Sequence, residues 1–147
     1  MKTFRNKKAE YNYYIQQQIE AGLMLQGTEI KSVRAGKINF KDSYARIEQG
    51  EVWLYNLHIS VYDKGSYNNH DPERPRKLLL NRREINKLQT KLDEQGYTLV
   101  PLELVINDQG LAKIILALAK GKKKYDKRES LQEKDRKRDQ DRVLKSR

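Results

Sequence analysis

The chain has 147 residues and a formal net charge of +11, which fits one domain with an appendage. This charge makes nucleic acid or an anionic membrane surface the natural partner, although a basic protein without a polyanionic ligand stays an alternative. The absence of cysteine excludes disulfides, thiolate metal sites and cysteine nucleophiles.

The first third of the chain is predicted to form a strand, a turn and a short helix. Apolar residues that alternate with polar ones predict a strand over residues 11–18. Ala21-Gly22 indicates a turn. Residues 28–35 have the pattern of a short helix, for which Thr28 is a suitable N-cap.

The middle of the chain is predicted to form a hairpin and a long loop. Residues 43–48 and 51–57 read as two strands joined across Gln49-Gly50. Residues 63–76 are polar and contain two prolines, which predicts a long loop. Long loops in compact domains are usually functional or mobile.

The last third before the tail contains the clearest elements. Residues 77–80 predict a short strand, and residues 81–95 an amphipathic helix with a capping box at its start. Residues 98–106 and 111–119 are two apolar strands around a hairpin loop. Pro101 lies inside the first of them and predicts an edge or a bulge there.

These elements predict an all-β fold for residues 1–119. About six short antiparallel strands with one or two short helices fit a small barrel of the oligonucleotide-binding type. An open α+β sheet is the alternative. The charged N-terminus is no secretory signal, and no run approaches the ~20 apolar residues of a membrane helix. We therefore expect a cytoplasmic, monomeric protein that does not bind membranes.

Residues 120–147 form a basic tail with 13 Lys/Arg and 6 Asp/Glu. Four large apolar side chains are too few to offset the entropy of ordering such a segment alone. Its charged residues are nevertheless good helix formers, and no Pro or Gly follows Gly121. We expect a tail that is disordered when free and helical on a partner; a purely solubilising tail is the alternative.

Catalytic motifs are missing from the sequence. The two histidines, His58 and His70, have no cysteine partners, and His70 is interpreted as a solvated loop residue. No nucleophile elbow, Gly-rich phosphate loop or HExxH motif occurs. The sequence therefore predicts a protein that is not an enzyme and binds no metal or cofactor.

Basic side chains gather near tyrosines at several places. Lysine and arginine release counterions from phosphates, and tyrosine stacks on unpaired bases, so these clusters predict contact with RNA. The alternative is a solvated surface above half-buried tyrosines. The predicted basic contacts are Lys7, Lys8, Lys31, Arg34, Lys37, Arg76, Lys77 and Arg82.

Six motifs stand out in the sequence: EAGL at 20–23, GTEIKSVRAG at 27–36, DSY at 42–44, KLLLNRREI at 77–85, GYT at 96–98 and AKGKK at 119–123. At matching spacing, these motifs closely resemble one family, the small protein B (SsrA- or tmRNA-binding) proteins of bacterial trans-translation. The resemblance implies a barrel that grips the tRNA-like domain of transfer-messenger RNA (tmRNA). It also implies delivery with elongation factor Tu to stalled ribosomes for their rescue. The tail would fold in the empty mRNA channel, near the decoding centre of the small subunit.

The resemblance also assigns residue roles. Those for tmRNA binding fall on Asn6, Glu20, Leu79 and Lys113. Those for the ribosomal step of the tail fall on Lys120, Gly121, Lys122, Lys123, Tyr125, Asp126, Lys127 and Arg128. Position 125 is often His in relatives, and Tyr can stack on a base there but cannot carry a positive charge.

Alternatives remain at the level of single residues and of function. Leu79 could belong to the core, and Glu20 could be an ordinary exposed turn acid. The whole chain could be a general single-strand RNA-binding or ribosome-associated barrel protein. A nuclease or RNA-modifying enzyme is a further alternative.

Overall fold

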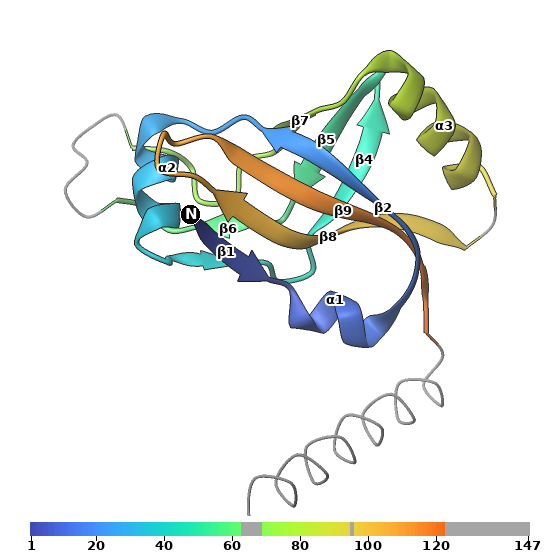
Figure 1. Ribbon diagram of the computed structural model, residues 1–147, viewed down its shortest axis with the longest axis horizontal. Coiled ribbons are helices and arrows are strands. Elements are labelled where there is room, and N and C mark those ends of the chain that lie inside the picture. Colours follow the sequence, from blue (N-terminus) through green and yellow to red (C-terminus); the bar gives the residue numbers. More distant parts are fainter. Residues whose placement is uncertain (63–68, 95, 123–147) are drawn as a thin grey trace, which may run out of the picture.

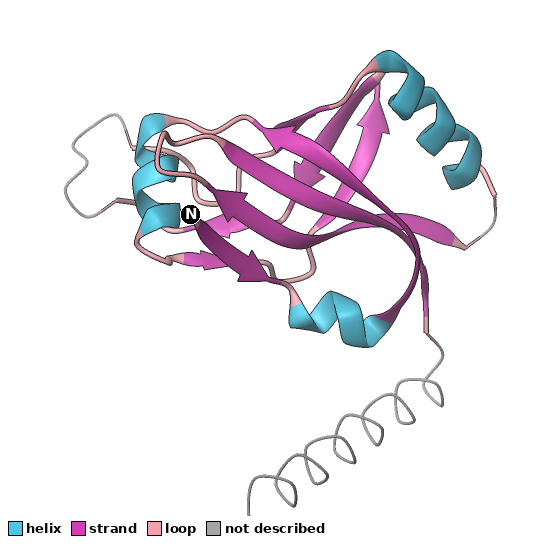
Figure 2. Ribbon diagram, in the orientation of Figure 1, coloured by secondary structure: helices cyan, strands magenta, loops and turns pink. Residues whose placement is uncertain are grey.

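The computed structural model describes residues 1–62, 69–94 and 96–122. The strands are β1 Lys2–Arg5, β2 Tyr13–Leu23, β3 Ile38–Asn39, β4 Tyr44–Glu48, β5 Glu51–Tyr55, β6 His58–Ile59, β7 Arg76–Leu79, β8 Tyr97–Ile106 and β9 Ala112–Gly121. The helices are α1 Lys7–Asn12, α2 Gly27–Arg34 and α3 Arg82–Leu92. Figure 2 shows that strands dominate and that the helices lie around them.

The described strands close into a barrel. Seven of them follow the order β1-β8-β4-β5-β7-β2-β9, and β9 pairs with β8 as well as with β2. This second pairing joins the two ends of the sheet, and β1 remains outside the ring on β8 (Figure 1). Every pairing is antiparallel. The all-β barrel that the sequence predicts is confirmed.

The core fills the barrel because alternate residues of each strand point inward. Leu54 of β5, Leu104 of β8 and Ile114 of β9 are completely buried. Burial of each such side chain contributes about 1.5–3 kcal/mol. α3 adds Ile85 and Leu88 to this cluster from its apolar face. None of the described helices has the length and apolar character of a membrane span.

A bulge lets β8 pair with three neighbouring strands, β9, β4 and β1. Its register against β9 shifts between Pro101 and Glu103, where a proline in a strand is tolerated. The predicted bulge is therefore confirmed. β8 pairs with β4 through Ala45 and Leu99, and with β1 beyond the bulge.

The N-terminal segment differs from its prediction. Residues 7–12 form α1, and the strand begins only at Tyr13. Asn6 starts the helix because its side-chain Oδ1 accepts the Ala9 amide at 3.3 Å, and Ala9 is buried against β8 and β9. This cap and the buried alanine outweigh the alternation of apolar and polar residues that predicted a strand from residue 11.

The predicted turn at Ala21-Gly22 is also wrong. β2 continues through it to Leu23, and Gly22 pairs with strands on both sides. β9 likewise extends past Ala119 to Gly121, so Lys120 and Gly121 belong to the barrel rather than to the tail. The end of the predicted second helix at residue 95, loop residues 63–68 and tail residues 123–147 lie outside the described residues.

Candidate nucleic-acid interface

An outward-facing cluster lies where β2 runs between β7 and β9. Gly22 pairs with Leu79 on one side and with Lys113 on the other. The Nζ atom of Lys113 lies 2.7 Å from Oε1 of Glu20, and both side chains are more than half exposed. Leu79 is 51% exposed, whereas its neighbour Leu78 is buried. We call Glu20, Leu79 and Lys113 the β2 face. Because Leu79 is exposed, the alternative that it belongs to the core is excluded.

Glycine at position 22 lets the Leu79 side chain lie across β2. A Cβ atom at Gly22 would come within 3.3 Å of the Leu79 Cβ, which is tighter than an ordinary contact. Glycine inside a strand often marks such a close approach. Gly22 therefore shapes the β2 face instead of ending the strand.

Lys77 extends the β2 face along β7. It lies two residues before Leu79, on the same side of the strand. Its Nζ atom is 2.9 Å from Oε1 of Glu51 on the neighbouring strand β5. The face thus offers ammonium groups for phosphates, a carboxylate that can accept from a base or sugar, and an apolar side chain.

Arg76 does not belong to this face, which corrects the sequence prediction. Its side chain is completely buried, and its Nε donates to Glu29 Oε2 at 2.5 Å. Its other nitrogens donate to the Leu57 and Pro72 carbonyls. The first residue of β7 points inward, so the guanidinium cannot reach RNA and serves the fold instead.

Glu29 is the carboxylate at the centre of this buried network. Arg74 Nη2 lies 2.5 Å from its Oε1, which also accepts the Gln26 amide at 2.8 Å. Burial by itself raises the pKa of the Glu29 carboxyl, but the hydrogen bonds from Arg74, the Gln26 amide and Arg76 outweigh it. The pKa of Glu29 therefore lies below its ordinary value, and α2 is tied to the start of β7.

His70 is a second correction in the same region. It is 5% exposed, not solvated, and its Nε2 lies 2.8 Å from the Ile59 carbonyl oxygen. Because that oxygen can only accept, Nε2 donates to it. Nδ1 lies 2.8 Å from the Thr28 hydroxyl. His70 thus ties the end of the long loop to α2 and β6.

The other predicted contacts lie at three separate places. Lys31, Arg34 and Lys37 lie on or just after α2, where Arg34 donates to the Asp108 carbonyl at the β8–β9 hairpin. Lys7 and Lys8 are exposed on α1, and Arg82 is exposed at the start of α3. Asn6 is buried and donates to the Pro101 carbonyl at 2.8 Å. Its geometry shapes α1, and an effect of Asn6 on RNA remains a prediction.

The described chain ends on two cation–π contacts. The Nζ atom of Lys120 lies 4.5 Å from the ring centre of Tyr97, and that of Lys122 lies 5.0 Å from the ring centre of Tyr14. The Lys122 amide also donates to the Asn12 carbonyl at 2.8 Å. The last described residues are thus held on the barrel. The other predicted tail residues, from Lys123 to Arg128, lie outside the described part of the chain.

Comparison with known proteins decides the family. The family model for SmpB protein matches residues 3–146. The chain belongs to the SmpB protein family. It is 58% identical over 143 residues to an SsrA-binding protein of Anoxybacillus flavithermus, with 97% of this chain and 92% of that protein covered. An SsrA-binding protein of Geobacillus sp. is 57% identical over the same shares.

A solved structure of this family supports the same assignment. A chain in "tmRNA-SmpB: a journey to the center of the bacterial ribosome" has a TM-score of 0.71 and 47% identity to this chain. The match covers 88% of this chain and 94% of that chain. The family resemblance inferred from the motifs is thereby confirmed. Within the described residues, no group of three or more potential metal ligands occurs.

Sequence reasoning missed the network around Glu29 and the strand position of Gly22. Glu29 lies within the motif GTEIKSVRAG, and Gly22 lies within EAGL. The motifs therefore pointed to these residues but did not reveal their physical roles. Nothing local in the sequence indicates that Glu29 meets Arg76, 47 residues away. A buried carboxylate and its partner are recognised only when the fold brings them together.

Proposed function

We propose that this chain binds the tRNA-like domain of tmRNA and acts, without catalysing a reaction, as an adaptor of trans-translation in the bacterial cytoplasm. The observation that carries the proposal is the β2 face, whose Glu20, Leu79 and Lys113 gather on one exposed surface. All three are tmRNA-binding positions by family resemblance. Relatives named SsrA-binding protein, 58% and 57% identical, support the same RNA.

The remaining roles complete the proposal. Delivery to stalled ribosomes takes place together with elongation factor Tu, and the protein acts as a monomer. The tail enters the empty mRNA channel near the small-subunit decoding centre, where Tyr125 stacks on a base. The tail's high density of lysine and arginine suits a channel walled by phosphates.

The direct test is a comparison of RNAs at matched salt. Fluorescence anisotropy should show a strong preference for the tRNA-like domain of tmRNA over bulk tRNA. Equal affinity for both would favour a general RNA-binding barrel protein. Turnover of any covalent bond in tmRNA, with or without divalent metal, would favour an RNA-modifying enzyme or a nuclease.

Lys113→Gln is expected to weaken binding of the tRNA-like domain by about 3–10-fold. The reason is the loss of one phosphate contact, which should also lower the slope of log affinity against log salt by about 0.9. Anisotropy titrations at several salt concentrations measure both quantities.

The matched control for Lys113 is Lys87→Gln on α3. Lys87 is exposed and carries the same charge, but it lies on α3 and not on the strands β2, β7 and β9 that carry the β2 face. The control should leave the affinity nearly unchanged. If the two variants behave alike, the β2 face does not contact the RNA at Lys113.

A further inference from the structure

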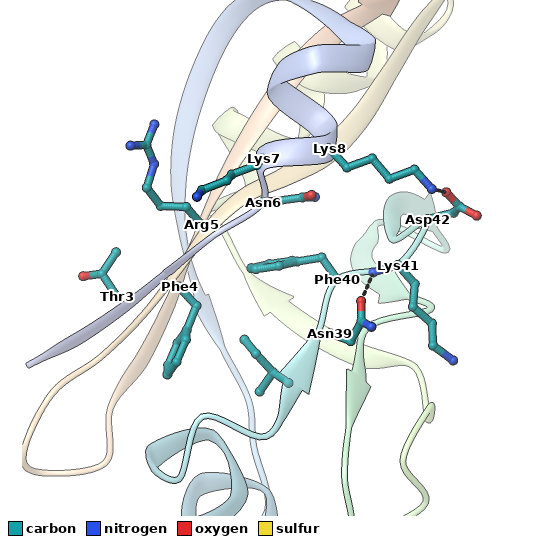
Figure 3. Close-up of a pocket in the computed structure, with 11 residues that line it drawn as sticks. Thr3, Phe4, Arg5, Asn6, Lys7, Lys8, Asn39, Phe40, Lys41 and Asp42 are labelled. Carbon is teal, nitrogen blue, oxygen red and sulfur yellow. Dashed lines mark hydrogen bonds and ion pairs between the residues drawn. The ribbon is translucent and has the colours of Figure 1, made fainter. Parts of the chain in front are cut away.

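A groove of about 800 Å³ lies between two segments that are distant in the sequence. One wall is formed by residues 3–8 of β1 and α1, and the other by residues 38–42, which follow α2. Figure 3 shows Phe40 projecting toward β1, and Lys8 reaching to Asp42 on the opposite wall. The Nζ atom of Lys8 lies 2.7 Å from Oδ1 of Asp42.

Cations outnumber carboxylates on the rim of this groove, although Arg5 pairs with Glu10 and Glu103 and Lys41 pairs with Glu73 just outside it. Four cations and one carboxylate line it, namely Arg5, Lys7, Lys8, Lys41 and Asp42. The Lys8 and Asp42 side chains are 59% and 82% exposed, so their ion pair is weak and a phosphate can replace it. Lys7 is exposed and forms no ion pair with any carboxylate of the described residues. The rim therefore suits a polyanion.

The floor of the groove is apolar. Phe40 is 8% exposed and Phe4 is partly buried, and both line the groove together with Ile38. A bare anion would gain nothing from two phenyl rings. A nucleotide combines a flat ring with a phosphate, and bases of single-stranded RNA commonly stack on aromatic side chains.

The groove borders the sheet that carries the β2 face. Strand pairing aligns Arg5 with Glu103, Glu103 with Ile115, and Ile115 with Glu20. Three strand spacings of about 4.8 Å place Arg5 on the order of 15 Å from Glu20. An RNA strand bound at the β2 face can span this distance with a few nucleotides.

We propose that this groove is a second RNA site, which holds one unpaired nucleotide. Its base lies against Phe4 and Phe40, and its phosphate lies on Lys7 and Lys8, where it displaces Asp42. The inference rests on the proposed function, because it assumes that RNA is bound on the adjacent sheet. The charge and the apolar floor favour RNA over a peptide of acidic residues alone, which has no ring to lie against the floor.

The experiment uses the full chain and two labelled probes in fluorescence anisotropy. One probe is a ten-nucleotide oligoadenylate, and the other is a ribose-phosphate chain of equal length without bases. Stacking of a base should make the oligoadenylate bind about tenfold tighter than the abasic chain. Phe4→Leu should reduce this ratio. Replacement of Lys7 and Lys8 by Gln should weaken both probes and lower the salt slope by about 0.7 for each lost phosphate contact.

Asp42→Asn is the most decisive variant because it should increase the affinity for oligoadenylate. Release of Lys8 from its carboxylate should tighten oligoadenylate binding roughly threefold. A merely structural role of the ion pair would leave the affinity unchanged or lower it. The two charge variants alter only exposed side chains, those of Lys7, Lys8 and Asp42, so thermal unfolding should confirm an intact fold.

The outcomes separate this inference from the proposed function. If the Lys7 and Lys8 variant binds as Lys87→Gln does, or if Asp42→Asn does not bind more tightly, the groove is not an RNA site. Competition by oligoglutamate as strong as that by oligoadenylate would also overturn it. Binding of the tRNA-like domain by the unaltered chain tests the proposed function separately, since that binding can persist when the groove variants show no effect.

Discussion

Removal of residues 123–147 is expected to abolish tagging on stalled ribosomes while the barrel still binds tmRNA. The segment carries eleven lysines and arginines, and the proposed role in the mRNA channel depends on their contacts with phosphate. Loss of several such contacts should reduce tagging by about 100-fold or more. Translation of a message without a stop codon, followed by mass spectrometry of the product, measures the tag.

The cut after Lys122 follows from the structure. β9 ends at Gly121, and the Lys122 amide still donates to the Asn12 carbonyl, so an earlier cut would damage the barrel. The shortened protein should bind the tRNA-like domain within about twofold of the full chain, because the β2 face is intact. Loss of that binding would contradict the division of work between barrel and tail.

A variant with a milder change in the tail is compared with this truncation. Lys123→Glu together with Lys124→Glu keeps the chain length but reverses two charges beyond the last described residue. Tagging should fall while the affinity for free tmRNA stays nearly constant. A fall in both by the same factor would assign these lysines to tmRNA binding instead of the ribosomal step.

Glu29→Ala is expected to lower the free energy of unfolding by about 3–5 kcal/mol, because it leaves a buried charge without its partner. Arg76 is completely buried, and Glu29 is its carboxylate partner at 2.5 Å. Urea unfolding followed by the fluorescence of Trp53, the only tryptophan, measures the change. The function should suffer too, because Arg76 begins the strand that carries Lys77 and Leu79.

The same network predicts the sign of a pH dependence. The pKa of Glu29 is lower in the folded chain than its ordinary value, so the unfolded chain binds the proton more tightly. This contribution to stability is fully present above the ordinary pKa and is lost as the pH falls through the folded value. As the pH falls, the free energy of unfolding of the unaltered chain should therefore decrease more than that of the Glu29→Gln variant, which has no carboxyl at this position to protonate.

The control for Glu29 is an exposed carboxylate in an ion pair. Glu94 lies 3.6 Å from Lys91, and its side chain is 52% exposed. Glu94→Ala should change the unfolding free energy little, since water and salt screen such pairs. If both alanine variants unfold at the same urea concentration, the Glu29 network does not stabilise the fold.

Much of the fold follows from local sequence patterns. The hairpin of β8 and β9 has two apolar runs around Asn107-Asp108-Gln109-Gly110, and α3 has a capping asparagine, Asn81, whose side chain accepts the Glu84 amide at 2.8 Å. Caps, turns and periodicity depend on neighbours within a few residues, so they can be read before the chain is folded. Net charge and ordered motifs likewise pointed to RNA and to the family.

The tertiary structure alone decided where the charged and apolar side chains of β7 point. Arg76 and Leu79 stand in one basic and apolar run, yet the arginine is buried and the leucine is 51% exposed. This inversion of the usual preference depends on Glu29, which is 47 residues away, and on Gly22 of the neighbouring strand. The groove between residues 3–8 and 38–42 has the same origin, because no local pattern shows which distant segments the barrel brings together.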